Sequence, residues 1–434
     1  MKKLIPPVKG TRDFYPEQMA VRNWLYGKMR EVSRSYGYQE YEAPILESLE
    51  LYAAKSGDEL VKQQSYVFKD RGGSEVTLRP ELTPSLARMV AQRQKELSFP
   101  LRWWSFGPFW RYERPQKGRS REFFQWNVDL LGVDTPEADA EIVAVLASFF
   151  RSVALTPSQV LILVGSRKQL DEQLASMKIP EARRPSVTAW IDRRGKLGAA
   201  AWRASGEEEG LIPDQIQGLE AYLEDERSWE GSDELVRFFA AMNAMGLQDY
   251  VRFNAGVVRG LAYYTGTVFE AWDIGGDIRR AILGGGRYDN LLAAVGGEPV
   301  AAVGFAMGDV VLGLLLEKYG LLPANLAATP AQVLVTVFDK NLQPTSLTVA
   351  SELRNAGVNA ATYPAVATLQ KQFKYADRLG VRFVIVIGSD EVTANEVLVK
   401  DLRSGEQERV GRAMVAADLK RRLGDTEATV KGAS

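Results

Sequence analysis

The stretch Phe106–Asp129, FGPFWRYERPQKGRSREFFQWNVD, largely decides the fold that we predict. Its apolar, aromatic start favours a strand in a buried sheet, its middle holds a proline and a glycine that favour a loop, and FFQW favours a returning strand. The span Arg111–Arg121 carries five basic residues and one acidic residue, Glu113. Guanidinium groups grip phosphates and aromatic faces stack on bases, so this hairpin is a candidate nucleotide site. A solvated basic hairpin without a ligand is the alternative.

Composition limits the kinds of chemistry that the chain can use. Its 434 residues suggest roughly three domains, and a net charge of -1 excludes a generally basic, DNA-coating protein. The sequence contains neither Cys nor His, so the usual zinc ligands and the usual neutral-pH base are missing. Catalysis must then rest on Arg, carboxylates, Tyr, backbone groups and Mg²⁺, which fits adenylate chemistry. No enzyme imidazole can titrate between pH 5 and 8, so we expect any rate inflection there to belong to the substrate.

No apolar run approaches the ~20 residues of a membrane span, and the start MKKLIPPVKG lacks the apolar core of a secretory signal. We therefore expect a cytoplasmic protein with neither membrane nor DNA as a partner.

Local patterns predict the elements of the first part of the chain. Residues 16–36 have apolar residues at helical spacing after Pro16, which predicts a helix. Residues 38–48 alternate like a strand, and Pro44 within them restricts that strand to a sheet edge or an interface. Segments 64–71 and 75–79 predict a hairpin around a Gly-Gly turn. Thr83 followed by a proline predicts a helix N-cap, although its hydroxyl is equally a candidate ligand group.

Later segments differ in character. Residues from about 168 to 235 carry scattered glycines and helical pieces and predict a small helical insertion, while Tyr264–Trp272 alternates like a strand. Residues 331–423 alternate strand and helix patterns, which predicts a small α/β domain with a mainly parallel sheet. Residues 424–434 are expected to be a disordered tail.

The order of residues in the hairpin resembles motif 2 of the class II aminoacyl-tRNA synthetases, and RYERPQKGRSREFFQ resembles the version found in histidyl-tRNA synthetases. Residues 36–50 resemble motif 1 and residues 302–316 resemble motif 3. The runs VRGLAYYTGTVFEAW (258–272) and LGGGRYDNLL (283–292) resemble the two histidine-specific signatures, and LRPELT resembles the amino-acid-binding loop.

The resemblance covers about residues 6–423 and implies the architecture. Residues 1–325 would form an α+β catalytic domain with the antiparallel sheet of class II synthetases, with motif 2 at about 104–129. Residues 331–423 would form an α/β anticodon-binding domain, and the insertion would help clamp the tRNA acceptor stem. The overall class is α/β.

The same resemblance implies the site. The residues that bind substrate would be Glu81, Leu82, Thr83, Arg111, Gln125, Asp129, Arg259, Tyr263 and Tyr264. The residues that bind ATP would be Arg111, Glu113, Arg119 and Phe123.

Individual roles follow from the family. Glu81 and Thr83 would hold the α-amino group, and Gln125 would contact the substrate near its α-carbon. Asp129 and Tyr264 would read the imidazole.

Two arginines would be catalytic. Arg111 would bind the carboxylate and the α-phosphate, and Arg259 would bridge the same groups from the opposite side. Phe123 would stack on adenine.

Four positions depart from the family pattern. Val310 and Val311 stand where motif 3 has Glu-Arg, a pair whose Arg packs over adenine and helps to hold ATP. Asp129 replaces a Glu, and Phe124 stands where many members have His.

The resemblance implies a histidine–tRNA ligase that uses ATP and Mg²⁺ but no zinc, acts on L-histidine and tRNA(His), and forms a homodimer through motif 1. A non-catalytic, histidine-binding regulatory subunit of histidine biosynthesis is an alternative; such proteins typically lack the anticodon domain and have a degraded first signature. A synthetase for another amino acid is a third possibility.

Overall fold

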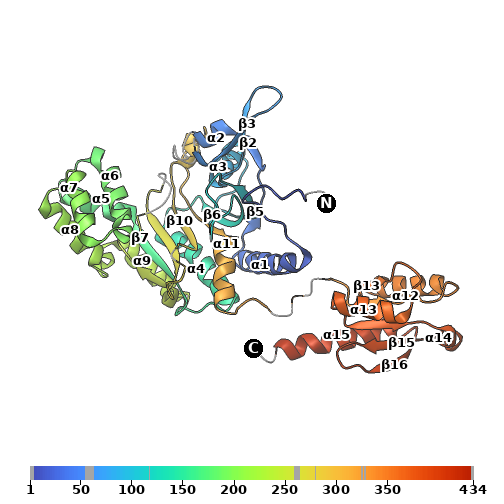
Figure 1. Ribbon diagram of the computed structural model, residues 1–434. Helices are drawn as coiled ribbons and strands as arrows, with labels where there is room; N and C mark the ends of the chain where they lie inside the picture. Colours follow the sequence, from blue (N-terminus) through green and yellow to red (C-terminus); the bar gives the residue numbers. More distant parts are fainter. Residues whose placement is uncertain are drawn as a thin grey trace. The chain divides into compact units, whose positions relative to one another are not determined.

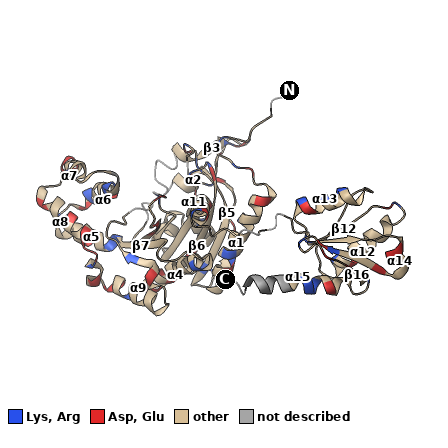
Figure 2. Cartoon of the chain, turned by 60° about the horizontal axis from the view of Figure 1, so that its bottom comes forward, with Lys and Arg blue, Asp and Glu red and all other residues tan. Residues whose placement is uncertain are grey.

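The computed structural model describes residues 4–53, 63–116, 118–258, 264–278, 280–323, 326 and 329–431 (Figure 1). The chain divides into two compact units, of which the first comprises residues 1–13 and 24–322 and the second residues 14–23 and 323–434. Acidic and basic residues are interspersed over both units (Figure 2). Among the described helices, none is long and apolar enough to cross a membrane.

An eight-stranded sheet organises the first unit. Its order is β1 (Gln39–Glu40), β5 (Leu101–Trp110), β6 (Glu122–Leu131), β11 (Ala302–Gly308), β10 (Leu283–Arg287), β9 (Thr267–Asp273), β7 (Val160–Ser166) and β8 (Val251–Phe253). The two outermost pairs are parallel and all the other pairs are antiparallel. The expected antiparallel sheet is therefore confirmed, and the hairpin of β5 and β6 lies within it.

The two faces of this sheet differ in chemistry because successive side chains of a strand point to opposite faces. One face is apolar: Trp126 and Val128 of β6 and Phe305 of β11 join the main core, to which helix α4 (Pro136–Ser152) also belongs. The alternate positions on the same two strands are polar or small, such as Asn127 and Ala306. The second face is thus free to carry a site.

Helices and a small sheet complete the core of the unit. They are α1 (Pro16–Ser35), which belongs to this unit from residue 24 onward, α2 (Leu49–Ala53), α3 (Thr83–Arg93), α10 (Leu291–Ala294), α11 (Asp309–Lys318) and the sheet β2 (Leu46–Ser48)–β4 (Glu75–Leu78)–β3 (Tyr66–Lys69). The helix expected from Pro16 and the hairpin expected at 64–79 are confirmed.

The single strand expected at 38–48 is wrong. The chain forms β1 and β2, which belong to different sheets, and Pro44 lies between them in neither strand. Proline cannot donate to a ladder, and here it marks the place where the chain leaves one sheet for the other.

The expected helical insertion comprises α5 (Arg167–Ser176), α6 (Arg184–Asp192), α7 (Ala199–Glu208) and α8 (Pro213–Glu224), and is followed by α9 (Asp233–Ala244). Short 3₁₀ turns lie at Glu181–Arg183, Arg194–Lys196, Ser228–Gly231 and Gln248–Tyr250. In Figure 1 helices α5 to α8 gather beside β7.

Two tryptophans hold α6 and α7 together. The indole rings of Trp190 and Trp202 are stacked, with centroids 3.8 Å apart and planes inclined by 14°. Each indole N–H donates to the backbone carbonyl of the other residue, at 2.9 and 3.0 Å. Both side chains are buried, so every polar group of the pair is satisfied away from water.

The second unit has a five-stranded sheet in the order β13 (Ala360–Thr362), β12 (Val333–Val335), β14 (Phe383–Val386), β15 (Glu396–Asp401) and β16 (Gln407–Gly411). Its helices are α12 (Gln343–Asn355), α13 (Leu369–Leu379), α14 (Ser389–Ala394) and α15 (Val415–Lys431). The α/β class is as expected, but only the pairs of β12 are parallel, so "mainly parallel" is wrong. Helix α15 also runs through most of the stretch expected to be disordered.

Candidate functional site

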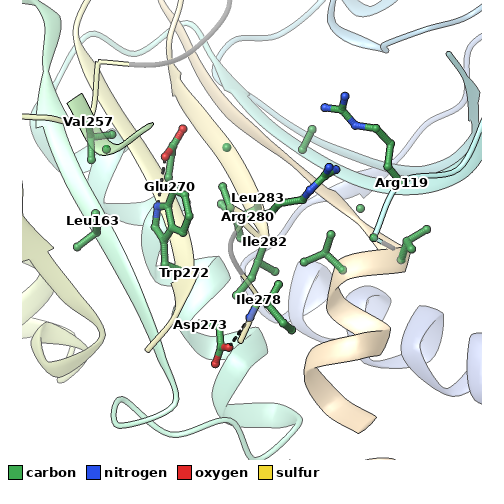
Figure 3. Close-up of a pocket in the computed structure, with 18 of the residues that line it drawn as sticks. Arg119, Leu163, Val257, Glu270, Trp272, Asp273, Ile278, Arg280, Ile282 and Leu283 are labelled. Carbon is green, nitrogen blue, oxygen red and sulfur yellow. Dashed lines mark hydrogen bonds between the residues drawn. The ribbon is translucent and has the colours of Figure 1, made fainter. Parts of the chain in front are cut away.

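Two adjoining pockets open on the polar face of the large sheet. We call one the large cavity, of about 1220 Å³, which lies among the loop of the β5–β6 hairpin, strands β9 and β10 and the first turn of α11 (Figure 3). The other, the small pocket, is more enclosed and includes Glu81, Asp129, Tyr264 and Tyr288. Arg111, Gln125 and Ala306 line both. A ligand at Arg111 would therefore have access to both spaces.

Small residues keep the floor of the large cavity open. Strand pairing places Ala306, Gly284 and Glu270 side by side on three neighbouring strands. A Cβ atom at Gly284 would meet no atom within 4 Å, so this glycine leaves open space above the sheet. Gly285 faces the opposite side of the sheet, where it leaves room for the Phe269 ring. A Cβ atom at Gly285 would lie 2.5 Å from that ring. Of the glycine triplet in LGGGRYDNLL, Gly284 is the one that lines the large cavity.

The hairpin fixes Arg111 by its backbone and by an aromatic ring. Arg111 Nε donates to the carbonyl oxygen of Pro80 at 2.9 Å, and its guanidinium carbon lies 5.3 Å from the centre of the Phe123 ring. Phe123 stacks in turn on Phe109, with centroids 6.0 Å apart. The guanidinium is thus positioned at the junction of the two pockets while its remaining N–H groups can face a ligand.

Other charges of the hairpin loop are paired. Arg119 Nε lies 2.5 Å from a carboxylate oxygen of Glu113, and Arg121 packs over the ring of Tyr112. The backbone N–H of Arg121 donates to the carbonyl oxygen of Gly10 at 2.9 Å, so residues before the first helix brace the hairpin.

Asp129 is one of the buried acidic groups that line the small pocket, the other being Glu81. The Tyr288 hydroxyl donates to Asp129 Oδ1 at 2.6 Å. A Cβ atom at Gly304 would lie 2.1 Å from the same oxygen, so glycine on the neighbouring strand makes the room for this carboxylate. Burial raises the pKa of Asp129 to about 7, although the Tyr288 hydrogen bond opposes the rise. A chain without histidine therefore still has a group that titrates near neutrality, beside the substrate's own.

Tyr264 lies beside three carboxylates. The alternating pattern had predicted that Tyr264 opens the strand, but β9 begins after it, at Thr267. Burial raises the pKa of Tyr264, and the charges of Glu81, Asp129 and Glu270 raise it further. The Tyr264 hydroxyl therefore stays protonated and can donate a hydrogen bond.

We expect Asp129→Asn to change how stability depends on pH. The carboxyl titrates near 3.8 when unfolded and near 7 when folded, so the folded protein holds the proton more tightly. Stability due to Asp129 therefore falls as the pH rises from about 4 to about 7. The Tm advantage of the variant should be absent below about pH 4, grow up to about pH 7 and then stay constant.

Thermal unfolding of the ligand-free protein across this range measures the effect. The exposed Asp249→Asn is the control and should follow the wild type at every pH. Parallel pH profiles for Asp129→Asn and the wild type would contradict the raised pKa.

Arg287 of the GGGRYD run has a structural role instead of a ligand-binding one. Its Nη2 donates to Asp139 Oδ1 at 2.6 Å and to the carbonyl oxygen of Thr135 at 3.2 Å, and its Nη1 donates to the carbonyl oxygen of Val133 at 3.1 Å. Both charged side chains are buried. The pair ties the end of β10 to the first turn of α4.

The structure brings together most of the residues that the sequence singled out. Glu81, Leu82, Thr83, Arg111, Gln125, Asp129 and Tyr264 line the small pocket, and Arg111, Glu113, Arg119, Phe123 and Gln125 line the large cavity. Arg259 and Tyr263 lie outside the described residues.

The expectation that Thr83 caps α3 is wrong. Thr83 is the first residue of the helix, and the N-cap is Leu82, which makes no side-chain capping bond. The sequence offered two roles for the Thr83 hydroxyl, helix capping and ligand binding. Without the capping role, ligand binding is the one that remains.

Two further residues were missed. Tyr288 reaches Asp129 from a position 159 residues away. Asp309, the first residue of α11, accepts from Arg12 Nη2 at 2.8 Å and from the backbone N–H of Phe124 at 2.9 Å. This carboxylate joins the start of the chain, the motif 2 strand and the motif 3 helix, and only the fold reveals the connection.

An antiparallel sheet that presents a hairpin arginine between two pockets defines the catalytic unit of a class II aminoacyl-tRNA synthetase. Comparison with known proteins identifies the family within this class. A family model described as histidyl-tRNA synthetase matches residues 10–309, and an anticodon-binding domain model matches residues 332–422.

Individual proteins that resemble this chain point to the same family. The chloroplastic/mitochondrial histidine–tRNA ligase of Arabidopsis thaliana is 41% identical over 416 residues, covering 94% of this chain and 85% of the relative. The histidine–tRNA ligase of Haloarcula marismortui is 37% identical, covering 95% and 97%. The crystal structure of histidyl-tRNA synthetase from Nostoc sp. PCC 7120 superposes with a TM-score of 0.83 at 30% identity, covering 97% and 100%. The chain belongs to the histidyl-tRNA synthetase family.

Proposed function

We propose that this protein is a histidine–tRNA ligase, which joins L-histidine to ATP with release of pyrophosphate and passes the histidyl group to the 3′ end of tRNA(His). The observation that carries the proposal is the pair of adjoining pockets. The small pocket, with the buried carboxyl groups of Glu81 and Asp129, suits an amino acid that has an ammonium group and a further N–H donor. The large cavity, with its arginines, suits a triphosphate, and Arg111 lies where the two ligands would meet.

The small pocket would bind histidine through both of its nitrogen-bearing groups. Glu81 is 4% exposed and precedes α3, so its carboxylate suits the α-ammonium group, with the Thr83 hydroxyl beside it. Asp129, held by Tyr288, would accept the imidazole N–H at the closed end. The Tyr264 hydroxyl would donate to the other imidazole nitrogen.

The chemical step joins two anions, the histidine carboxylate and the α-phosphate, which repel each other. Arg111 would neutralise both, and its charge would stabilise the additional negative charge of the transition state. The Phe123 ring beneath it and the Pro80 carbonyl fix the guanidinium in advance, so little reorganisation accompanies the reaction. Arg259 would complete this neutralisation from the opposite side.

ATP would occupy the large cavity with its base near Phe123 and its phosphates toward Glu113 and Arg119. Mg²⁺ suits this arrangement because it binds mainly to phosphate oxygens and few protein carboxylates. Within the described residues, no three acidic side chains gather as a metal site, so the nucleotide would bring most of the ligands. The second unit would read the anticodon and the insertion would contact the acceptor stem; we place the reaction in the cytoplasm.

The direct test is ATP–pyrophosphate exchange with each of the twenty amino acids in turn. Exchange that depends on histidine alone is the expected result, followed by charging of tRNA(His). Histidine binding without exchange would instead identify the regulatory alternative. Exchange with a different amino acid would identify a synthetase of another specificity.

We also expect a homodimer that forms through the small β2–β4–β3 sheet. Strand β2 of this sheet lies within the motif 1 region, and the sheet and the preceding Ile45 expose four apolar side chains, Ile45, Leu46, Val67 and Phe68. Adjacent exposed apolar side chains of this size are usual at interfaces between subunits.

Sedimentation at micromolar concentration should give a dimer for the wild type and a monomer for Leu46→Asp/Phe68→Asp. Met414→Asp is a matched control, since Met414 is an exposed apolar residue of the second unit. A wild-type monomer would exclude this interface.

A further inference from the structure

Arg280 lies in the loop between β9 and β10 and points into the large cavity (Figure 3). Its side chain is half-buried. Within the described residues, Arg280 makes no hydrogen bond or ion pair. A guanidinium that is partly removed from water without a partner costs free energy, unless a ligand supplies the missing acceptors.

The other arginines of the cavity are already engaged. Arg111 donates to Pro80 and lies over Phe123, and Arg119 pairs with Glu113. Arg194 pairs with Glu224 at 2.6 Å. Among the described cavity residues, Arg280 is thus the guanidinium whose whole hydrogen-bonding capacity is available.

The loop that carries Arg280 is braced on helix α11. The Lys318 ammonium group donates to both oxygens of Asp273, at 3.1 and 2.8 Å, and the Tyr319 hydroxyl donates to the same carboxylate at 2.7 Å. That carboxylate also accepts from the backbone N–H of Ile278 at 3.2 Å. The base of the loop is therefore fixed to the C-terminal end of α11.

The tip of the loop meets the N-terminal end of the same helix. A Cβ atom placed on Gly118 of the hairpin would lie 3.7 Å from Val311 Cγ2 and 4.0 Å from Arg280 Cδ. Arg280 and Val311 therefore face the same point of the hairpin loop. Val311 offers only methyl groups there, whereas Arg280 brings a guanidinium to the same part of the cavity wall.

We propose that Arg280 binds the phosphate chain of ATP, opposite the hairpin arginines. It would take over part of the holding of ATP that motif 3 assigns to the first turn of α11, but not the packing over adenine. This inference rests on the proposed function, since it takes ATP as the occupant of the large cavity. A triphosphate carries several negative charges and many acceptor oxygens, which suit a planar guanidinium with five N–H donors. The base would make no contact with Arg280.

Two probes separate phosphate binding from base binding. Calorimetric titration with inorganic tripolyphosphate and with adenosine is done on the full chain. Arg280→Ala should weaken tripolyphosphate binding about 10- to 100-fold, the usual range for a lost hydrogen bond to a charged group. Adenosine binding should not change. Arg280→Lys should retain part of the affinity, because it keeps the charge but not the planar fork.

Relocating the charge is the sharper test. In Arg280→Ala/Val311→Arg the guanidinium would come from α11 instead of the loop, and tripolyphosphate affinity should recover most of the loss. In the exchange reaction, the variants that bind tripolyphosphate more weakly should also have the higher KM for ATP. Arg252→Ala is the matched control, since Arg252 is an exposed arginine of the same sheet outside the cavity lining.

Unchanged tripolyphosphate affinity in Arg280→Ala would overturn the proposal, as would equal losses for tripolyphosphate and adenosine. A wild type that binds no tripolyphosphate would overturn it as well. Histidine binding without nucleotide should be the same in all variants and reports an intact fold. A different result would contradict the proposed function. In that case the wild type would show no histidine-dependent exchange, whatever its affinity for tripolyphosphate.

Discussion

Arg111→Ala is expected to lower the rate of histidine-dependent ATP–pyrophosphate exchange by about 100- to 1000-fold, the usual loss when one pre-positioned group that stabilises developing charge is removed. Arg111 lies at the junction of the two pockets, where the carboxylate and the α-phosphate would meet. Its contacts with Pro80 and Phe123 hold it in place before any ligand arrives. Because the guanidinium serves the transition state more than either ligand alone, kcat should fall much more than the KM values rise.

Arg114→Ala is the matched control for this variant. Arg114 is an exposed arginine of the same hairpin loop and does not line either pocket. Its loss removes one positive charge from the loop and should leave exchange close to the wild-type rate. A similar fall in both variants would mean that the overall charge of the loop matters, and that Arg111 has no special position.

Arg287→Ala is expected to lower the free energy of unfolding by about 3 to 5 kcal/mol, because it leaves a buried carboxylate without its partner. The side chains of Arg287 and Asp139 are 7% and 4% exposed, and their nearest oxygen and nitrogen are 2.6 Å apart. The variant also frees the carbonyl oxygens of Val133 and Thr135, which accept from Arg287. Urea unfolding measures the loss.

A comparison with Arg102→Ala separates burial from mere pairing. Arg102 makes a similar two-bond contact with Glu141, but its side chain is 35% exposed. Exposed pairs of this kind contribute about 0.2 to 1 kcal/mol. The double variant Arg287→Met/Asp139→Leu should recover part of the stability lost in Arg287→Ala, since it removes the unpaired charge. Equal losses for Arg287→Ala and Arg102→Ala would contradict a dominant role of burial.

The sequence predicted well those parts of the molecule whose determinants are local. The hairpin with Arg111 and Phe123 lies in one continuous stretch, and the helix after Pro16 follows from an initial proline and apolar residues at helical spacing. Both were therefore recognisable without the fold, and so was the antiparallel sheet once the family resemblance was available.

Contacts between distant segments could not be predicted in this way. Nothing near Asp129 in the sequence indicates that Tyr288 donates to it, because the contact arises only when β6, β11 and β10 are aligned in one sheet. Pro44 pointed correctly to a sheet edge, since β1 and β2 each lie at the edge of their sheet, but not to a change of sheet. Thr83 was misplaced by one residue, a shift that local signals of helix starts do not resolve.

The stacked pair of Trp190 and Trp202 gives the helical insertion an optical property of its own. Two indoles with centroids 3.8 Å apart and fixed in orientation couple their electronic transitions, which produces paired circular dichroism bands of opposite sign. The coupling depends on the contact between α6 and α7. The insertion thus contains an intrinsic spectroscopic probe of that contact, which can be followed without a label.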